Sequence, residues 1–359
     1  MVLHGDKVKA LYIPGPSFHD PQVREYAGWA KILDYQLQGI EKAGFDVTVA
    51  EVPKEYIDAG TSFSQIASYS LYIAANYPID SYKLIIGAQS YMHYSIMRRN
   101  PAKTRAISFV WNNADWHRDV MLKDEYAKHH GKYTTLPINT VMNDTALRMS
   151  DCVVACCPFV KNTHIQISGL ANKVKVAFWG VDSEMFSPAL EQPSEFKVLF
   201  PGTDPIRKGL VYMLGTMRLL QDLEIKVVLC GGQYTVRDAS NFESTGMIPH
   251  SEMPDVMRQC SIVLLPTLED GLACSVQEAM ACGVVPITTD TAADPFEHNV
   301  SGFRIPYRDS EMAAEYIRLL KGNPSLLLCM SHETRIKALT QTWGKYINDL
   351  SNIIKKVCE

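Results

Sequence analysis

The chain has 359 residues, of which 47% are hydrophobic and 21% are charged, and this balance excludes a disordered, collagen-like or disulfide-scaffold protein. Its net charge of −4 argues against a protein whose main task is to coat nucleic acid. The length favours two domains of about 150 residues each. Because the nine cysteines include no Cys-x-x-Cys pair and the chain opens without a signal-like apolar core, we expect reduced thiols in a cytoplasmic protein.

Short apolar runs that predict strands alternate with helical patterns along nearly the whole chain. The strands predicted in the first half are 8–13, 46–52, 83–87, 105–111, 152–156 and 173–178. Those predicted in the second half are 197–202, 226–231, 261–267, 285–288 and 302–305. Helices are predicted at 22–43, 140–149, 209–222, 276–282 and 343–357. Repeated β-α-β units imply an α/β protein whose parallel sheets are covered by helices on both faces.

A polar stretch with two prolines, 187–193, separates the two series of strands. It predicts an N-terminal domain at 1–187 and a C-terminal domain at 188–337. The remaining segment, 338–359, carries a helix that either crosses back to the N-terminal domain or packs on its own domain.

Polar clusters of the second half follow strand ends, where open parallel sheets bind their ligands. In the first cluster, Arg207 and Lys208 stand in a glycine-bounded turn that leads into a helix. A pair of cations there suits a diphosphate, because it neutralises charge that develops on a leaving group. The alternative is a solvated basic turn.

The loop 271–274 follows another strand and leads into a helix, for which Ser275 is the predicted N-cap. Free backbone N–H groups at a helix N-terminus favour anions and hydroxyl groups. Asp270 and Glu278 bracket this loop, and a sugar linked to a diphosphate would offer hydroxyls to the carboxylates and oxygens to the N–H groups. The alternative is that the two acids only interact with the helix dipole.

From 197 to 306 these residues resemble the nucleotide-sugar domain of glycosyltransferase family 4, the retaining GT-B enzymes. The resemblance rests on the phosphate turn 200–209, the base-contacting segment 246–257, the paired-acid signature 265–283 and the turn 297–303. Further matches are 150–154, 178–188 and 342–346, so the resemblance covers most of the chain, densely from about 150 onward and thinly before. The resemblance implies two Rossmann-like domains facing a cleft, with the C-terminal helix crossing back to the first domain.

The resemblance also implies transfer of a hexosyl group, with retention, from a UDP- or GDP-sugar to an acceptor hydroxyl. Asp270 would hold sugar hydroxyls, Arg207 and Lys208 the departing diphosphate, Glu278 the ribose, and the backbone near Ile248 the base. The remaining residues expected around the sugar donor are Gly15, Gly202, Thr203, Gly231, Glu269, Gly271, Leu272, Ala273, Cys274 and Ser275. The resemblance implies no metal and no cofactor beyond the nucleotide sugar.

Four positions depart from the family pattern. Asp270 stands where the family has Glu, with Glu269 beside it, and Thr203 stands where many members have Arg. The glycine-rich first loop is reduced to 14–16. Near the reacting carbon the family often has a His, and here the candidates are Asn112, which aligns with that position, and His117, five residues further on.

Two rival functions remain open from the sequence. One is a GT-B sugar-nucleotide epimerase, and the other is a binding-only homologue that has lost turnover. The acceptor is unknown. The mildly basic first domain leaves peripheral membrane association open, and a nucleic-acid acceptor is disfavoured without being excluded.

Overall fold

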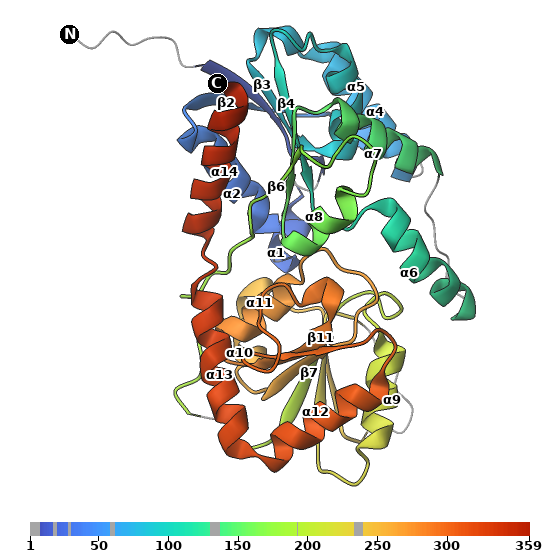
Figure 1. Cartoon of the computed structure of the whole chain (residues 1–359), viewed down its shortest axis with the longest axis vertical. Coiled ribbons are helices and arrows are strands. Elements are labelled where there is room, and N and C mark those ends of the chain that lie inside the picture. The colour runs from blue at the N-terminus through green and yellow to red at the C-terminus, as the bar shows by residue number, and fades with distance from the viewer. Residues whose placement is uncertain are drawn as a thin grey trace, which may run out of the picture.

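A computed structural model describes residues 8–16, 20–27, 30–57, 62–129, 137–191, 193–232 and 240–359 of the chain. Two six-stranded parallel sheets form the centres of two stacked domains (Figure 1). The first sheet has the order β2-β1-β3-β4-β5-β6, and the second has the order β12-β11-β10-β7-β8-β9. The predicted fold class, two Rossmann-like domains with helices around parallel sheets, is therefore confirmed.

The strands of the first sheet are β1 (Val8–Ile13), β2 (Phe45–Val49), β3 (Leu84–Ala88), β4 (Arg105–Val110), β5 (Cys152–Ala155) and β6 (Val174–Val176). Those of the second sheet are β7 (Lys197–Pro201), β8 (Lys226–Cys230), β9 (Phe242–Gly246), β10 (Ile262–Leu265), β11 (Val285–Thr289) and β12 (Phe303–Ile305). Every strand predicted from the sequence is present, with small shifts at the ends. The additional strand is β9, a partly exposed edge strand that lacks the apolar run by which the others were predicted.

The helices around the first sheet are α1 (Pro21–Tyr26), α2 (Lys31–Lys42), α3 (Lys54–Ile57), α4 (Ser62–Asn76), α5 (Gln89–Arg98), α6 (Asp115–Lys128), α7 (Pro137–Met149) and α8 (Pro158–His164). Those around the second are α9 (Leu210–Leu219), α10 (Met253–Met257), α11 (Cys274–Ala281), α12 (Ser310–Gly322) and α13 (Pro324–Leu339). The last helix is α14 (Trp343–Cys358).

The first sheet is buried on both faces, as the continuous apolar strands require. Tyr12 of β1 belongs to one hydrophobic cluster, and its neighbours Leu11 and Ile13 belong to the cluster on the opposite face. This alternation follows from the two-residue period of a strand.

Helix α14 crosses back from the second domain and packs on α2 of the first (Figure 1). The rings of Trp343 and Tyr35 stack with centroids 4.2 Å apart, and Tyr346 is buried in the core of the first domain. At the crossing, Val181 N–H donates to the carbonyl of Gln341 at 2.9 Å. The two segments of the chain that join the domains, one at Val181 and the other at Thr342, therefore lie side by side. The expected crossing of the C-terminal helix is confirmed.

Two predicted helices are corrected. The single helix expected at 22–43 is two helices, α1 and α2, with 28–29 outside the described residues. No residue of α1 is buried, so it does not share the apolar face of α2. Helix α11 begins at Cys274, with Ala273 at the N-cap position and no side-chain capping bond, so Ser275 is a residue of the first helical turn rather than the N-cap.

Candidate functional site

A cavity of about 1030 Å³ lies between the two domains. Its second-domain wall is formed at the carboxyl ends of β7, β8 and β10, and its first-domain wall includes α1. The residues predicted for the sugar donor or the reacting carbon that line it are Asn112, Gly202, Thr203, Arg207, Lys208, Gly231, Ile248, Glu269, Asp270, Gly271, Leu272, Ala273, Cys274, Ser275 and Glu278. The volume is of the size that a small-molecule site requires, about 300–1,000 Å³.

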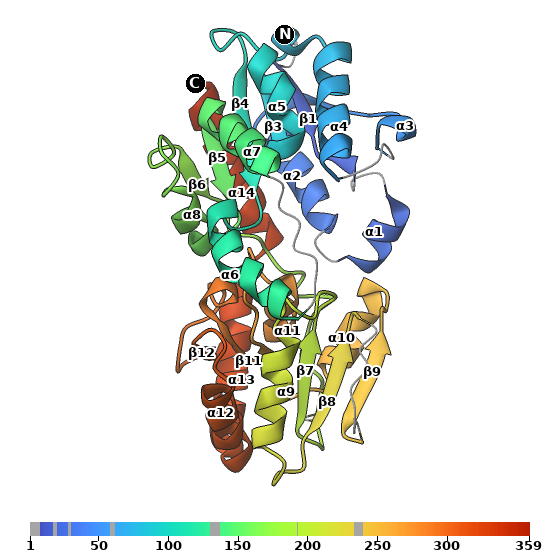
Figure 2. The same cartoon turned by 90° about the vertical axis from the view of Figure 1, so that its right-hand side faces the viewer.

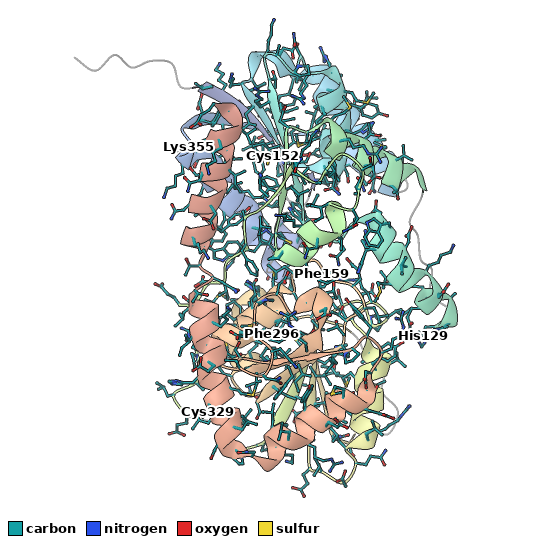
Figure 3. All side chains as sticks on the ribbon, viewed as in Figure 1. His129, Cys152, Phe159, Phe296, Cys329 and Lys355 are labelled. Carbon is teal, nitrogen blue, oxygen red and sulfur yellow. The ribbon has the colours of Figure 1, made fainter. Side chains whose placement is uncertain are left out.

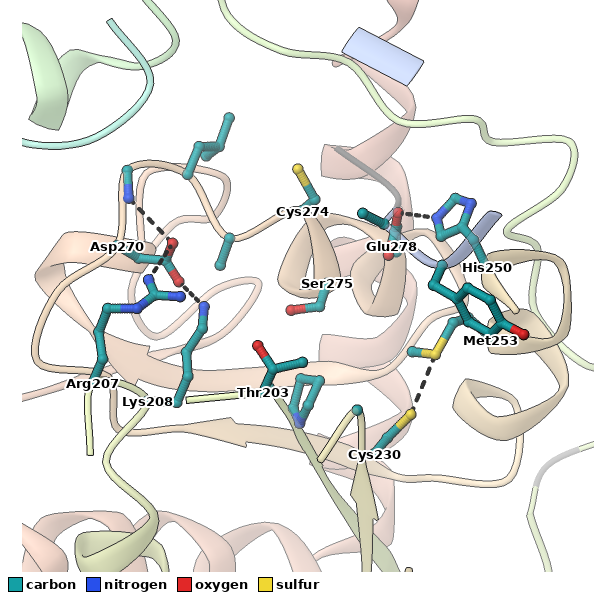
Figure 4. Close-up of a pocket in the computed structure, with 18 of the residues that line it drawn as sticks. Thr203, Arg207, Lys208, Cys230, His250, Met253, Asp270, Cys274, Ser275 and Glu278 are labelled. Atoms are coloured by element: carbon teal, nitrogen blue, oxygen red, sulfur yellow. Dashed lines mark hydrogen bonds and ion pairs between the residues drawn. The ribbon is translucent and has the colours of Figure 1, made fainter. Parts of the chain in front are cut away.

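The turn between β7 and α9 presents Arg207 and Lys208 to this cavity (Figure 4). Asp204 organises the turn, because its Oδ1 accepts from the Arg207 backbone N–H at 3.1 Å and its carbonyl accepts from the Lys208 N–H at 2.9 Å. Gly209 ends the turn at φ +76°, and a Cβ there would lie 2.0 Å from the carbonyl oxygen of Pro266. The glycine that bounds the predicted phosphate turn is therefore required by the backbone.

The Asp270 carboxylate faces these two cations. Lys208 Nζ donates to Asp270 Oδ2, and Arg207 Nη1 lies 3.5 Å from Asp270 Oδ1. Burial alone would raise the pKa of the Asp270 carboxyl, but the charges of Lys208 and Arg207 and the hydrogen bonds to the carboxylate outweigh it and hold that pKa below its usual value. Burial also lowers the pKa of Lys208, and the charge of Asp270 opposes that shift.

Glu269, the neighbouring acid, is 1% exposed and lies deeper in the wall. Its Oε2 is 3.8 Å from Arg118 Nε of the first domain and 3.9 Å from Arg207 Nη1. Burial raises the pKa of this carboxyl, although the two arginines oppose the shift. Both acids of this pair therefore share Arg207, and only Asp270 also contacts Lys208 through a hydrogen bond.

The loop after Asp270 is pressed against the first domain. A Cβ at Gly271 would lie 1.6 Å from the carbonyl oxygen of Trp111, so only glycine fits between the domains here. Asn113 Nδ2 crosses the same seam and donates to the Asp270 carbonyl at 2.7 Å and to Thr291 Oγ1 at 2.9 Å. Asn113 was not predicted from the sequence, in which its only signal is its place beside Asn112.

The N-terminus of α11 follows this loop. Ala273 provides no side-chain cap, although its carbonyl accepts from the Val276 N–H at 2.9 Å. The N–H groups of Cys274 and Ser275 have no hydrogen bond among the described residues and are available to oxygen atoms of a ligand. One helical turn on, Glu278 Oε1 lies 2.7 Å from His250 Nε2 (Figure 4). His250 also lines the cavity and was not predicted.

An apolar part of the wall lies next to this pair. Met247, Ile248 and Met253 line it, and Cys230 Sγ lies 3.3 Å from Met253 Sδ. A flat, largely apolar ring fits such a wall, with polar groups reading its edge. The segment that resembles a base-contacting loop therefore lies at one end of the cavity, and the two cations lie at the other end (Figure 4).

Two predicted site residues do not line the cavity. His117 lies with its ring edge-on to Trp116 and Phe159, and burial lowers the pKa of its imidazole. Gly15 packs under Tyr91, where a Cβ would lie 2.6 Å from the ring. Of the two alternatives near the reacting carbon, Asn112 faces the cavity and His117 does not.

Helix α6 of the first domain reaches the second domain near α9 (Figure 2), and His129 marks the C-terminal end of this helix in Figure 3. The Glu125 carboxylate, 1% exposed, accepts from Tyr212 OH at 2.5 Å and from Arg308 Nε at 3.0 Å. Tyr126 OH donates to Asp204 Oδ2. The helix therefore connects the first domain to the residue that shapes the Arg207–Lys208 turn.

Among the described residues, no cluster of three or more His, Cys, Asp or Glu side chains is arranged to hold a metal ion. Across the same part of the chain, every helix is too short or too polar to cross a membrane.

Comparisons with known proteins agree with this geometry. Residues 195–322 match the family model described as Glycosyl transferases group 1. No curated protein matches the sequence. The fold is similar to that of a sucrose-phosphate synthase from Thermosynechococcus elongatus, with a TM-score of 0.77 at 15% identity over 97% of this chain and 98% of that chain.

Two further solved structures share the fold. HepE from Anabaena, described in complex with UDP and glucose, has a TM-score of 0.71 at 15% identity over 97% of this chain and 100% of that chain. A glycosyltransferase from Rickettsia africae has a TM-score of 0.67 at 13% identity over 98% of this chain and 99% of that chain. The chain thus has the two-domain GT-B fold, and its second domain carries the group 1 glycosyltransferase family match.

Proposed function

We propose that the protein transfers a hexosyl group, with retention of configuration, from a UDP- or GDP-sugar to an acceptor hydroxyl. The observation that carries this proposal is the meeting of Arg207, Lys208 and Asp270 beside an uncapped helix N-terminus in the interdomain cavity. Cations and N–H groups fit a diphosphate, and the adjacent carboxylate fits the hydroxyls of the sugar attached to it. That HepE is described with UDP-glucose supports the class of sugar donor.

Each part of the nucleotide sugar has a matching part of the wall. The base would lie along Ile248 and Met253, the ribose near Glu278, and the diphosphate over Gly202, Thr203 and Gly231 toward the two cations. The Lys208 ammonium has three N–H groups, so it can keep its bond to Asp270 and still donate to a phosphate oxygen. The transferred sugar would then lie between Asp270 and the 271–274 loop.

Retention follows if the acceptor approaches on the face that the diphosphate leaves. The bond between the anomeric carbon and the phosphate oxygen breaks, the bond to the acceptor oxygen forms on the same face, and the acceptor proton passes to the leaving phosphate. Asn112, which faces the cavity, is neutral and can orient the acceptor by hydrogen bonds but cannot serve as the base. Arg207 and Lys208 would stabilise the charge that accumulates on the phosphate.

We further propose that no metal ion takes part. The two cations and the N–H groups of α11 supply the neutralisation that a divalent ion provides in other transferases. Activity should therefore survive a chelator, whereas abolition by EDTA with rescue by manganese would contradict this part of the proposal.

The test is a screen of UDP- and GDP-sugars by thermal shift, followed by turnover assays with the sugars that bind. A ligand at 100 times its dissociation constant stabilises the folded state by about 2.7 kcal/mol, which a melting curve resolves. Release of nucleoside diphosphate with an α-configured sugar product from an α-configured donor is expected. A change in the sugar of the intact nucleotide would point to an epimerase instead, and binding without any turnover would point to a binding protein.

A further inference from the structure

We infer that His250 is a positioning residue that fixes the Glu278 carboxylate for a vicinal diol, and thereby sets the preference for ribo- over deoxyribonucleotides. The inference rests on the proposed function, in which Glu278 meets the ribose. His250 begins a short 3-10 helix, His250–Glu252, and Glu278 lies on α11, so the pair connects the base-side segment to the paired-acid helix.

The contact between the two side chains is short and enclosed. His250 Nε2 lies 2.7 Å from Glu278 Oε1, and the side chains are 9% and 12% exposed. Both residues line the interdomain cavity (Figure 4). A hydrogen bond to a carboxylate in such a shielded place is stronger than one in water, because solvent competes less for it.

The rest of the imidazole has no comparable polar partner. Its ring lies against Phe186 with centroids 5.2 Å apart, and its Nδ1 is buried without a hydrogen bond among the described residues. Burying an imidazole with one nitrogen unpaired is costly if the ring only fills space, since an apolar side chain would avoid that cost. The bond to Glu278 is therefore the feature that distinguishes histidine from a phenylalanine or leucine at this place.

The geometry also leaves Glu278 competent for a ligand. When Nε2–H donates to Oε1, the carboxylate can no longer turn freely, and no other hydrogen bond to its oxygens is found in the described part of the chain. A carboxylate has about four acceptor sites on its two oxygens, so two hydroxyls of a ribose can both donate to it. Because the carboxylate is fixed before the ribose binds, less side-chain conformational entropy is lost on binding.

The experiment compares UDP with 2′-deoxy-UDP, and GDP with 2′-deoxy-GDP, by calorimetry. His250→Phe keeps an aromatic ring but removes the N–H donor, and His250→Gln retains a donor. His332→Phe, an exposed position on α13, is the matched control. For the nucleotide that binds the wild-type protein, we expect His250→Phe to weaken the ribo form about tenfold, the order of one hydrogen bond to a charged group, and to leave the 2′-deoxy form nearly unchanged. His250→Gln should recover part of the ribo preference.

Each other outcome is decisive. Equal weakening of the ribo and deoxy forms by His250→Phe would mean that His250 only supports the fold, and an unchanged ribo preference would remove it from the site. Glu278→Gln distinguishes a failure of this inference from a failure of the proposed ribose site. If Glu278→Gln lowers nucleotide affinity and His250→Phe does not, the inference fails and the proposed function stands. If Glu278→Gln has no effect, or if neither UDP nor GDP binds the wild-type protein, the proposed ribose site is wrong and the inference falls with it.

Discussion

The two walls of the cavity differ in how they are held. On the second-domain wall, buried charged side chains contact one another directly, as Lys208 and Asp270 do. On the first-domain wall, Arg118 and Trp111 are likewise held against the second domain, but Gln22, Val23 and Tyr26 belong to α1, a short helix without a buried residue. A wall fixed by its own contacts binds with little reorganisation, whereas a lightly packed helix can adjust. Under the proposed function, the preorganised side would bind the sugar donor, and the part of the first-domain wall formed by α1 would adapt to the acceptor.

The largest expected effect is on turnover, from removing the charge of Asp270. Asp270→Asn should lower kcat by about a hundredfold or more, because a carboxylate that stabilises developing positive charge on the sugar acts mainly in the transition state. Affinity for the free nucleoside diphosphate, which carries no sugar, should change little. Steady-state kinetics and calorimetry on the same variant measure both quantities.

Two further variants test the role of Asp270. Asp270→Glu introduces the glutamate that glycosyltransferase family 4 has at this position. Its side chain is one methylene longer, and the variant should retain part of the activity. If Asp270→Asn weakened diphosphate binding as strongly as Glu278→Gln, the sugar would not lie over the 270–274 loop. Greater damage from Glu269→Gln would move the sugar contact to the neighbouring acid.

Lys208→Ala should lower the affinity for nucleoside diphosphate about tenfold or more, since a hydrogen bond to a charged group contributes roughly 1.5–3 kcal/mol. Lys226→Ala is the matched control, because that lysine pairs with Glu195 outside the cavity. Calorimetry gives both affinities. Unchanged diphosphate affinity in Lys208→Ala would remove Lys208 from the diphosphate site.

The contact between the two domains is tested at Glu125, a residue of α6 whose carboxylate binds Tyr212 and Arg308 of the second domain. Burial raises the pKa of its carboxyl, but Tyr212 and Arg308 of the second domain outweigh that effect and leave its pKa lowered. A carboxyl whose pKa is lower in the folded protein than in the unfolded chain stabilises the folded state at a pH above its unfolded pKa, which is about 4.3 for Glu. That contribution is lost as the pH falls through the folded pKa. Glu125→Gln should therefore lower the melting temperature at pH 7, with a kcat decrease of a few-fold.

A melting series from pH 7 downward measures this contribution. The difference between the wild-type and Glu125→Gln curves should be full above the unfolded pKa of about 4.3 and should vanish as the pH falls through the lower folded pKa. A constant difference at every pH would mean that the charge of Glu125 does not hold the domains together.

The smallest change in affinity for the sugar donor is expected from a substitution on α1. Tyr26 is 39% exposed, and Tyr26→Ala should change stability by no more than about 0.5 kcal/mol, as for an ordinary surface position. Affinity for the sugar donor should stay within about twofold, since it is fixed by the other wall. Once an acceptor is known, its KM should rise. A tenfold loss of donor affinity would end the distinction between the two walls.

Local patterns were enough to predict most of the framework. β10 and β3 are apolar throughout, and such runs bounded by turn residues identify buried strands. The glycines at 209 and 271 mark places where no side chain fits, so the motifs around them could be recognised without the structure. The polar edge strand β9 has no such pattern and was missed.

Contacts between distant segments could not be predicted. Asn113 lies 157 residues from the Asp270 carbonyl that it contacts, and Glu125 lies 183 residues from Arg308. No periodicity in the sequence encodes such pairs. The start of α11 was misplaced for a related reason, because the packing of Gly271 on Trp111, and not a capping side chain, fixes the chain just before the helix.

We propose that the second-domain wall binds a nucleoside-diphosphate sugar without a metal. The most direct test is calorimetric titration of the wild-type protein, in EDTA, with a panel of UDP- and GDP-sugars, repeated with Lys208→Ala. We expect that at least one of these sugars binds, and that Lys208→Ala weakens its binding about tenfold or more. Folded wild-type protein that binds none of them in EDTA, or binds one equally well without Lys208, would contradict it.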